Sequence, residues 1–222
     1  MVTRPCRVRT MRHSRLLIAV AIVVAATLPA SVGAQPSAWP DCEGKDPDRA
    51  IAACSQIIKA GRERPQQLAT AYRARAEAYR QKGQFERAIA DYSEAIRLNP
   101  TYAVAFHERG SAYNAKGDSD KALADLNEAI RLDAKSAAAY TNRGRVYERQ
   151  KKYDEAIADH DMAIKLNPKL AIAYANRGLA YEGKGDLTRA LADFEAALAI
   201  DPKLERAIEG RKRVQSKEPA KQ

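Results

Sequence analysis

Residues 137–170 read AAAYTNRGRVYERQKKYDEAIADHDMAIKLNPKL, and residues 171–204 read AIAYANRGLAYEGKGDLTRALADFEAALAIDPKL. Both stretches have an aromatic residue at position 4, glycine at position 8, tyrosine at position 11 and alanine at positions 20 and 27. Two further copies of this 34-residue unit precede them, at 69–102 and 103–136. A unit that recurs at a fixed period is typical of a protein built by stacking one small structural element several times.

The repeated pattern predicts two helices in each unit. Positions 4, 8 and 11 lie on one face of a helix, and positions 20, 24 and 27 lie on one face of a second helix. The polar segment between them contains Gly83, Gly117 and Gly185, and glycine commonly follows the end of a helix. Lys151 stands where these units have glycine, so a strained or differently capped turn is expected there. One such hairpin cannot bury its own apolar face, whereas a stack of hairpins can.

These repeated residues closely resemble the tetratricopeptide repeat family, over residues 69–204 of the chain. The resemblance implies an all-α fold, a right-handed α-solenoid of antiparallel helix hairpins. It also implies that the first helices of the hairpins line a concave groove that holds a peptide ligand. Positions 5, 6, 9 and 12 of each unit would face this groove.

The candidate groove residues follow from those positions. They are Arg73, Glu77, His107, Ser111, Asn114, Thr141, Asn142, Arg145 and Asn176. Asn142 and Asn176 resemble the asparagines that hold the ligand backbone in the family, because an amide can both donate and accept. The alternative is an ordinary solvated helix face. The family's clamp for chaperone tails needs lysine and asparagine at positions 5 and 9 of one unit, and the chain does not supply this pair, so that specific function is not expected.

A charged pattern also recurs, with arginine at position 7 and aspartate at position 23 of every unit. The expected structural ion pairs are Arg75 with Asp91, Arg109 with Asp125, Arg143 with Asp159, and Arg177 with Asp193. In antiparallel hairpins the two positions fall at about the same level. Because the acids match the arginines one for one, we favour pairs that lock each hairpin over an arginine ladder for an anionic ligand.

The segments that flank the repeats are expected to cap the stack. Residues 35–68 are interpreted as an N-terminal capping segment with a half-repeat helix at 47–60 and a disulfide between Cys42 and Cys54. The disulfide is favoured because two cysteines in an exported chain usually pair, and metal binding is a poor competitor. Residues 205–222 are expected to form a capping helix and a polar tail.

The first 34 residues read as a secretory signal peptide. They carry five arginines and no acid, then an uncharged run at 16–28, then Val32 and Ala34 in the small-residue pattern of a cleavage site. Cleavage after Ala34 would place a bacterial protein in the periplasm or outside the cell. Retention of the segment as a membrane anchor is the alternative, and either Met1 or Met11 could be the start.

Composition limits the function further. The formal charge is +10, of which the five N-terminal arginines supply half, and the remaining charge is too small to indicate nucleic-acid binding. His107 and His160 lie at different repeat positions without metal-ligand spacing, and His160 stands where other units have an apolar core residue. No nucleophile-and-base arrangement, phosphate-binding glycine loop or nucleotide motif is present. We therefore expect neither an enzyme nor a cofactor.

The sequence thus predicts an exported, non-catalytic scaffold that binds a protein or peptide in its concave groove. Two alternatives stay open. One is an envelope assembly factor tethered to the membrane by its N-terminal segment, and the other is a carbohydrate- or anion-binding module that uses the groove arginines and asparagines.

Overall fold

The helices expected from the repeat pattern are present in the computed structural model, which describes residues 38–217. The predicted signal peptide and its predicted cleavage site lie outside these residues. The helices in this range are α1 Trp39–Cys42, α2 Pro47–Ala60, α3 Pro65–Gln81, α4 Phe85–Leu98, α5 Ala103–Lys116, α6 Ser119–Leu132, α7 Ala137–Arg149, α8 Tyr153–Leu166, α9 Ala171–Lys184, α10 Leu187–Ile200 and α11 Glu205–Lys217. The described part of the chain has no strand, so the predicted all-α class is confirmed.

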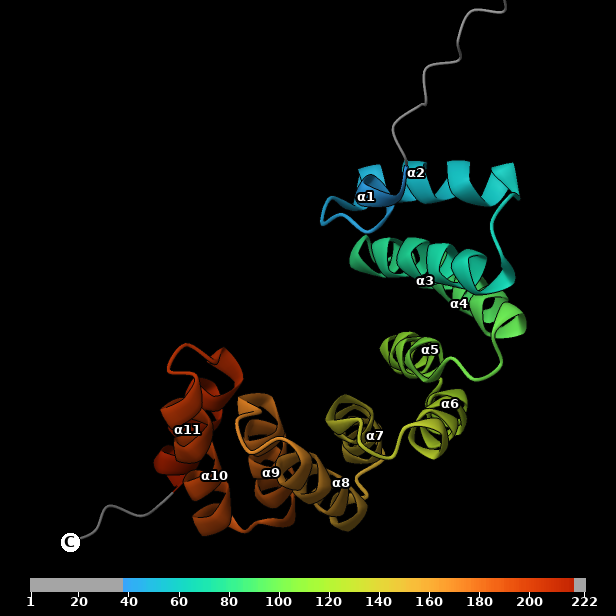
Figure 1. Cartoon of the computed structure of the whole chain (residues 1–222). Coiled ribbons are helices and arrows are strands. Elements are labelled where there is room, and N and C mark those ends of the chain that lie inside the picture. The colour runs from blue at the N-terminus through green and yellow to red at the C-terminus, as the bar shows by residue number, and fades with distance from the viewer. Residues whose placement is uncertain (1–37, 218–222) are drawn as a thin grey trace, which may run out of the picture. The chain divides into compact units, whose positions relative to one another are not determined.

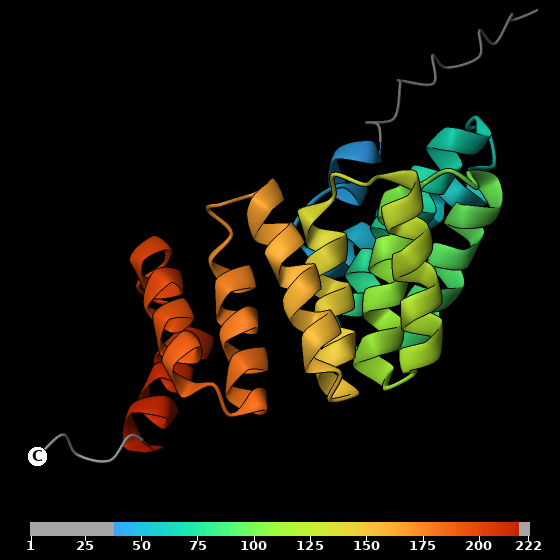
Figure 2. The same cartoon turned by 90° about the horizontal axis from the view of Figure 1, so that it is seen from below.

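Each repeat forms one antiparallel hairpin, and each hairpin packs against the next along the chain. The first helices α3, α5, α7, α9 and α11 also contact one another in order, whereas no such contacts join α4, α6, α8 and α10. The first helices therefore lie on the inner side of the curve that α3–α11 follow, as Figure 1 shows. Figure 2 shows the same helices side by side from a second direction. The inner side is where the family resemblance places the groove.

The helix boundaries follow local chemistry and differ slightly from the repeat boundaries. Helix α3 begins at Pro65, four residues before the first repeat, because proline is well suited to the first position of a helix. Helix α11 continues to Lys217, into the segment expected to be a polar tail. None of the helices within residues 38–217 is both long enough and apolar enough to cross a membrane.

The turn of the third repeat is strained, as expected from the lysine at the position where the other repeats have glycine. Gly117 and Gly185 adopt positive φ angles of 90° and 83° after α5 and α9. Lys151 occupies the same place after α7 with φ of 59°, and no other described residue except glycine has a positive φ. A left-handed backbone costs a residue with a Cβ atom about 1–2 kcal/mol.

The core of each hairpin depends on the close approach of its two helices at position 8. A Cβ atom added to Gly144 would lie 2.6 Å from Cε1 of His160, and one added to Gly178 would lie 2.9 Å from Cε1 of Phe194. His160 and Phe194 both occupy position 24, where every repeat has a fully buried side chain. His160 is therefore a core residue, as expected. Its Nε2 atom lies 2.7 Å from Oε1 of Glu148, on α7.

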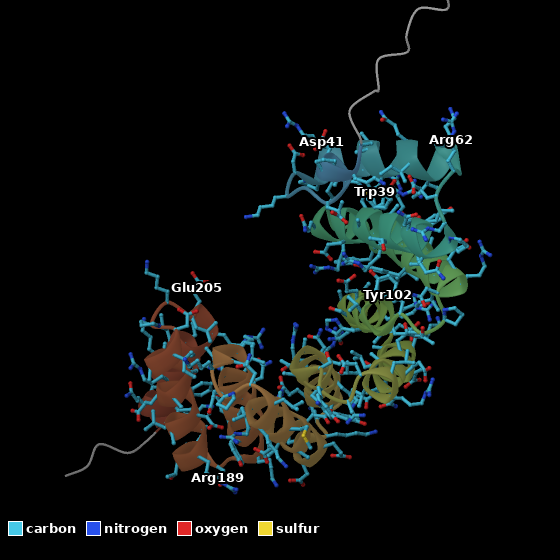
Figure 3. The ribbon with its side chains drawn as sticks, viewed as in Figure 1. Trp39, Asp41, Arg62, Tyr102, Arg189 and Glu205 are labelled. Carbon is cyan, nitrogen blue, oxygen red and sulfur yellow. A yellow bond between two sulfur atoms is a disulfide. The ribbon has the colours of Figure 1, made fainter. Side chains whose placement is uncertain are left out.

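Both ends of the stack are covered. Cys42 of α1 and Cys54 of α2 form the predicted disulfide, and both are buried beside Ala71 of α3. At the other end, Ala207 and Val214 of α11 pack against Phe194 of α10. Trp39 and Glu205 mark these two caps in Figure 3, in which side chains occupy the spaces between neighbouring helices.

Candidate binding groove

The four arginine–aspartate pairs are formed, and all have the same geometry. In the third repeat, Nε and Nη2 of Arg143 donate to the two carboxylate oxygens of Asp159 at 2.8 and 2.7 Å. The other three pairs have corresponding distances of 2.7–2.8 Å. The aspartate side chains are only 7–10% exposed, and their hydrogen bonds raise the pKa of each arginine. These guanidinium groups are occupied inside the hairpins, which favours the structural interpretation.

The same arginines also connect successive hairpins. The third nitrogen of Arg143, Nη1, donates to Oδ1 of Asn127 on α6 at 2.7 Å. Nη1 of Arg109 likewise donates to Oγ of Ser93 on α4 at 2.9 Å. Nη1 of Arg177 similarly donates to Asp161 on α8, so three of the arginines hold both their own hairpin and the preceding one, whereas Nη1 of Arg75 donates to Ser55 on the capping helix α2.

Several candidate groove residues contact each other across the repeat boundaries. Nη1 of Arg73 on α3 lies 3.1 Å from Oε1 of Glu108 on α5. Nε2 of His107 lies 2.6 Å from Nδ2 of Asn142 on α7. Burial lowers the pKa of His107, and the charge of Arg80 lowers it further. Position 5 of one repeat is thus joined to position 6 of the next.

The N-terminal part of the groove pairs its charges. Nε and Nη2 of Arg80 donate to both oxygens of Glu77 at 2.7 Å. Burial raises the pKa of Glu108 to about 7, and the nearby charge of Glu77 acts in the same direction, whereas Arg73 opposes the shift. Here the groove offers few free charges to a ligand.

Asn176 is not open to a ligand, contrary to the sequence-based expectation. Its side chain is fully buried, and Nη1 of Arg206 donates to its Oδ1 atom at 3.2 Å. The reason is that α11 packs against α9, on the side where a further repeat would stand. Asn142 and Asn176 therefore do not form two exposed amides one repeat apart.

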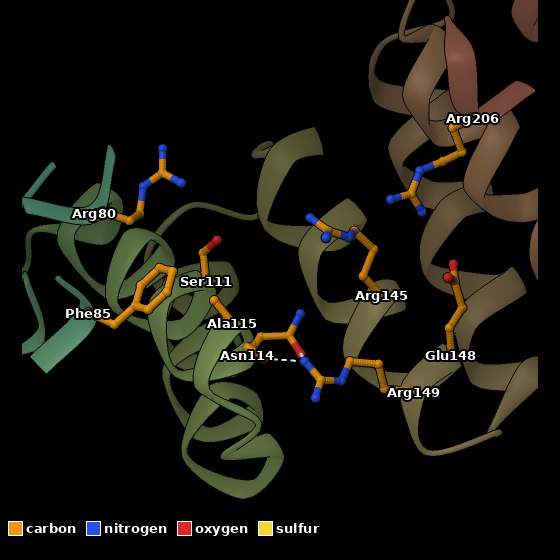
Figure 4. A pocket seen from close by; sticks show the side chains of 9 residues that line it. All are labelled: Arg80, Phe85, Ser111, Asn114, Ala115, Arg145, Glu148, Arg149 and Arg206. Atoms are coloured by element: carbon orange, nitrogen blue, oxygen red, sulfur yellow. Dashed lines mark hydrogen bonds between the residues drawn. The ribbon is translucent and has the colours of Figure 1, made fainter. Parts of the chain in front are cut away.

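Two cavities open between the first helices. The larger has a volume of about 400 Å³ and is shown in Figure 4. It is lined by Arg80, Phe85, Ser111, Asn114, Ala115, Arg145, Glu148, Arg149 and Arg206. The smaller has a volume of about 310 Å³. It is lined by His107, Ala137, Ala138, Thr141, Asn142, Arg145, Asn167, Leu170 and Ile172.

These cavities contain six of the nine candidate groove residues, namely Ser111, Asn114, His107, Thr141, Asn142 and Arg145. Glu77 and Arg73 lie instead beside a smaller depression next to Cys42 and Gly44. Arg80 and Glu148 are at position 12, so the repeat pattern could have identified them. Arg206 comes from the cap, and only the packing of α11 brings it to the cavity.

Arg145 is the residue that both cavities share, and its environment is cationic. It is half-buried, and no hydrogen bond or ion pair joins it to another described residue. Burial lowers its pKa, and the positive charges of Arg206 and Arg149 lower it further, whereas the negative charge of Glu148 opposes the shift. Within residues 38–217, no cluster of His, Cys, Asp or Glu side chains is arranged to hold a metal ion.

Comparisons with known proteins agree with this geometry. A family model described as "TPR repeat" matches residues 76–117 and 110–151, and one described as "Tetratricopeptide repeat" matches 144–215. The crystal structure of MamA is 31% identical over 72% of this chain and 92% of that chain, with a TM-score of 0.61. The first TPR domain of Spaghetti (RPAP3), bound to the HSP90 peptide SRMEEVD, is 28% identical over 51% of this chain and 90% of that chain, with a TM-score of 0.50.

A third solved structure shares the fold at lower identity. YrrB, a TPR protein described as having an unusual peptide-binding site, is 23% identical over 75% of this chain and 84% of that chain, with a TM-score of 0.60. A comparison with curated protein sequences gave no match.

Proposed function

This chain belongs to the tetratricopeptide repeat family, and on that premise we propose that it is a non-catalytic scaffold that binds a peptide or protein segment in its groove. The observation that carries the proposal is the pair of cavities, of about 400 and 310 Å³, that open between the first helices of successive repeats. The RPAP3 domain, which is bound to a peptide in its solved structure, supports the same mode of action.

A site-specific photocrosslinking experiment tests the binding face. A photoreactive phenylalanine analogue would replace Ala115, an exposed residue that lines the larger cavity on α5. The matched control carries it at Ala124, an exposed alanine on α6. In cells, the Ala115 variant should yield a discrete crosslinked protein that the Ala124 variant does not. A crosslink from Ala124 alone would place the partner on the outer helices and overturn the groove proposal.

We also propose that the protein acts after export to the periplasm, with residues 1–34 removed. The buried Cys42–Cys54 disulfide supports this location, because disulfides persist mainly in oxidising compartments. Mass spectrometry of the protein from a bacterial envelope fraction should find an N-terminus at Gln35 and no free thiol among these two cysteines. Recovery of residues 16–34 on the envelope protein would instead support a membrane-tethered assembly factor.

A further inference from the structure

The larger cavity has an excess of positive charge that the chain does not neutralise. Four arginines and one glutamate line it. The charge of Arg80 is balanced by the bidentate contact with Glu77. Arg149 donates to the backbone oxygen and Oδ1 of Asn114, which are neutral acceptors. Arg206 likewise donates to a neutral amide oxygen. Three guanidinium charges, those of Arg145, Arg149 and Arg206, therefore remain.

The single carboxylate of this cavity is already engaged. Oε1 of Glu148 lies 2.7 Å from Nε2 of His160, whose side chain is fully buried in the hairpin core. Glu148 nevertheless lines the cavity with the arginines. In Figure 4 the side chains of Arg145 and Arg206 extend into the same space from α7 and α11. A carboxylate in that space would face two cations.

The third repeat differs from the other three at position 9, where it has Arg145. Position 9 is Glu77 in the first repeat, Ser111 in the second and Leu179 in the fourth. Because Arg145 is half-buried beside two like charges, the ionised guanidinium loses solvation, and the charge of Glu148 offsets this only in part. A bound anion would supply a counter-ion through charge-assisted hydrogen bonds.

The smaller cavity adds an apolar subsite beside the same arginine. Ala137, Ala138, Leu170 and Ile172 contribute aliphatic surface to its wall. At its polar edge, His107 and Asn142 contact each other. A volume of about 310 Å³ accommodates a branched aliphatic side chain. Arg145 stands between this subsite and the cationic cavity.

From this geometry we propose that the groove binds an acidic peptide segment, with a carboxylate at Arg145, Arg149 and Arg206 and an adjacent aliphatic side chain in the smaller cavity. The proposal rests on the proposed function and names the chemistry of the partner. The site uses positions 9 and 13 of the third repeat together with the C-terminal cap. It is therefore distinct from the position 5 and 9 clamp that the chain lacks.

Selection from random peptide libraries tests the proposal without knowledge of the partner. Octapeptides would be displayed in two forms, one with a free C-terminus and one fused at both ends. Selection on residues 35–222 should enrich Asp or Glu next to Leu, Ile or Val. Enrichment in both libraries assigns the carboxylate to a side chain, and enrichment only with a free C-terminus assigns it to the chain end. Selected peptides without acids would overturn the inference while leaving groove binding intact. No selection above background would contradict the proposed function as well.

Variants then assign the binding to the named residues. Arg145→Ala should weaken the binding of a selected peptide by about tenfold or more, as measured by fluorescence anisotropy. The difference in affinity between wild type and variant should shrink at high salt. Arg131→Ala is the matched control, because Arg131 is an exposed arginine on α6 that pairs only with Glu128. Thermal melting of Arg145→Ala should match the wild type, which separates lost binding from lost folding. Equal affinity of the two variants would exclude Arg145 as the anion-binding residue.

Discussion

The second and third repeats are neighbouring hairpins of one design that differ in what they present to the groove. Both pair an arginine at position 7 with an aspartate at position 23, and both place a glycine against the core residue at position 24. Four of their differences matter most here, which are Glu108 and Asn142 at position 6, Ser111 and Arg145 at position 9, Gly117 and Lys151 at position 15, and Leu126 and His160 at position 24.

The comparison teaches that a core substitution can change the charge of a binding surface. Leu126 makes no polar contact, so it has no influence on the groove side chains of α5 beyond packing. His160 at the same core position engages Glu148, which then does not pair with Arg145. The shared residues hold the hairpin, and the differing ones set the electrostatics of the cavity.

The largest expected effect concerns what the two repeats share. Arg109→Ala and Arg143→Ala should each lower the free energy of unfolding by about 3 kcal/mol, because each leaves a nearly buried aspartate without its partner. Arg145→Ala, two residues from Arg143 on the same helix, should change stability by less than about 0.5 kcal/mol. Urea denaturation measures all three. If Arg145→Ala is as destabilising as Arg143→Ala, then Arg145 has a structural role and the contrast between the two arginines fails.

A smaller effect concerns Glu108 of the second repeat, which should make the free energy of unfolding depend on pH. The pKa of Glu108 is raised from 4.5 to about 7, so the folded chain keeps a proton that the unfolded chain has released. The resulting stabilisation, about 3 kcal/mol in full, is complete below pH 4.5 and is lost as the pH rises through 7. Burial, Glu77, Arg73 and Arg80 together set this shift.

Glu108→Gln should therefore flatten the fall in unfolding free energy between pH 5 and pH 8. Ser111→Ala, on the same helix α5, is the control and should leave the slope unchanged because serine does not titrate. The free energy would be measured by urea denaturation at both pH values. An unaltered slope in Glu108→Gln would show that another group controls the pH dependence.

The smallest effect concerns the turns. Lys151→Gly should stabilise the protein by about 1 kcal/mol, because glycine adopts φ of 59° without the clash of a Cβ atom. Gly117→Lys is the reciprocal variant and should destabilise by a similar amount, since Gly117 has φ of 90°. Melting temperatures in matched buffer would measure both. Equal stabilities of wild type and Lys151→Gly would mean that the strain at Lys151 is compensated elsewhere.

Residues close in sequence made much of the fold predictable. The 34-residue period, the helix faces, the glycine turns and the strained Lys151 all follow from spacings within one repeat. Arg143 and Asp159 are 16 residues apart and belong to one hairpin. Because the two helices of a hairpin are antiparallel, the sequence spacing predicted that these residues lie at the same height along the helices. The Cys42–Cys54 disulfide was predicted because the expected export of the chain leaves two cysteines, and two cysteines in an exported chain usually pair.

The sequence by itself therefore determined the repeated hairpin, and the tertiary structure decided which groove side chains are free. Arg73 forms an ion pair with Glu108, which is 35 residues away, whereas Arg145 forms none within residues 38–217 and Glu148 contacts His160. Asn176 became buried because α11 covers α9, and the same helix brought Arg206 to the cavity. These outcomes depend on how one hairpin is placed against the next. That placement is set by the packing of many side chains at once, which no spacing within a single repeat specifies.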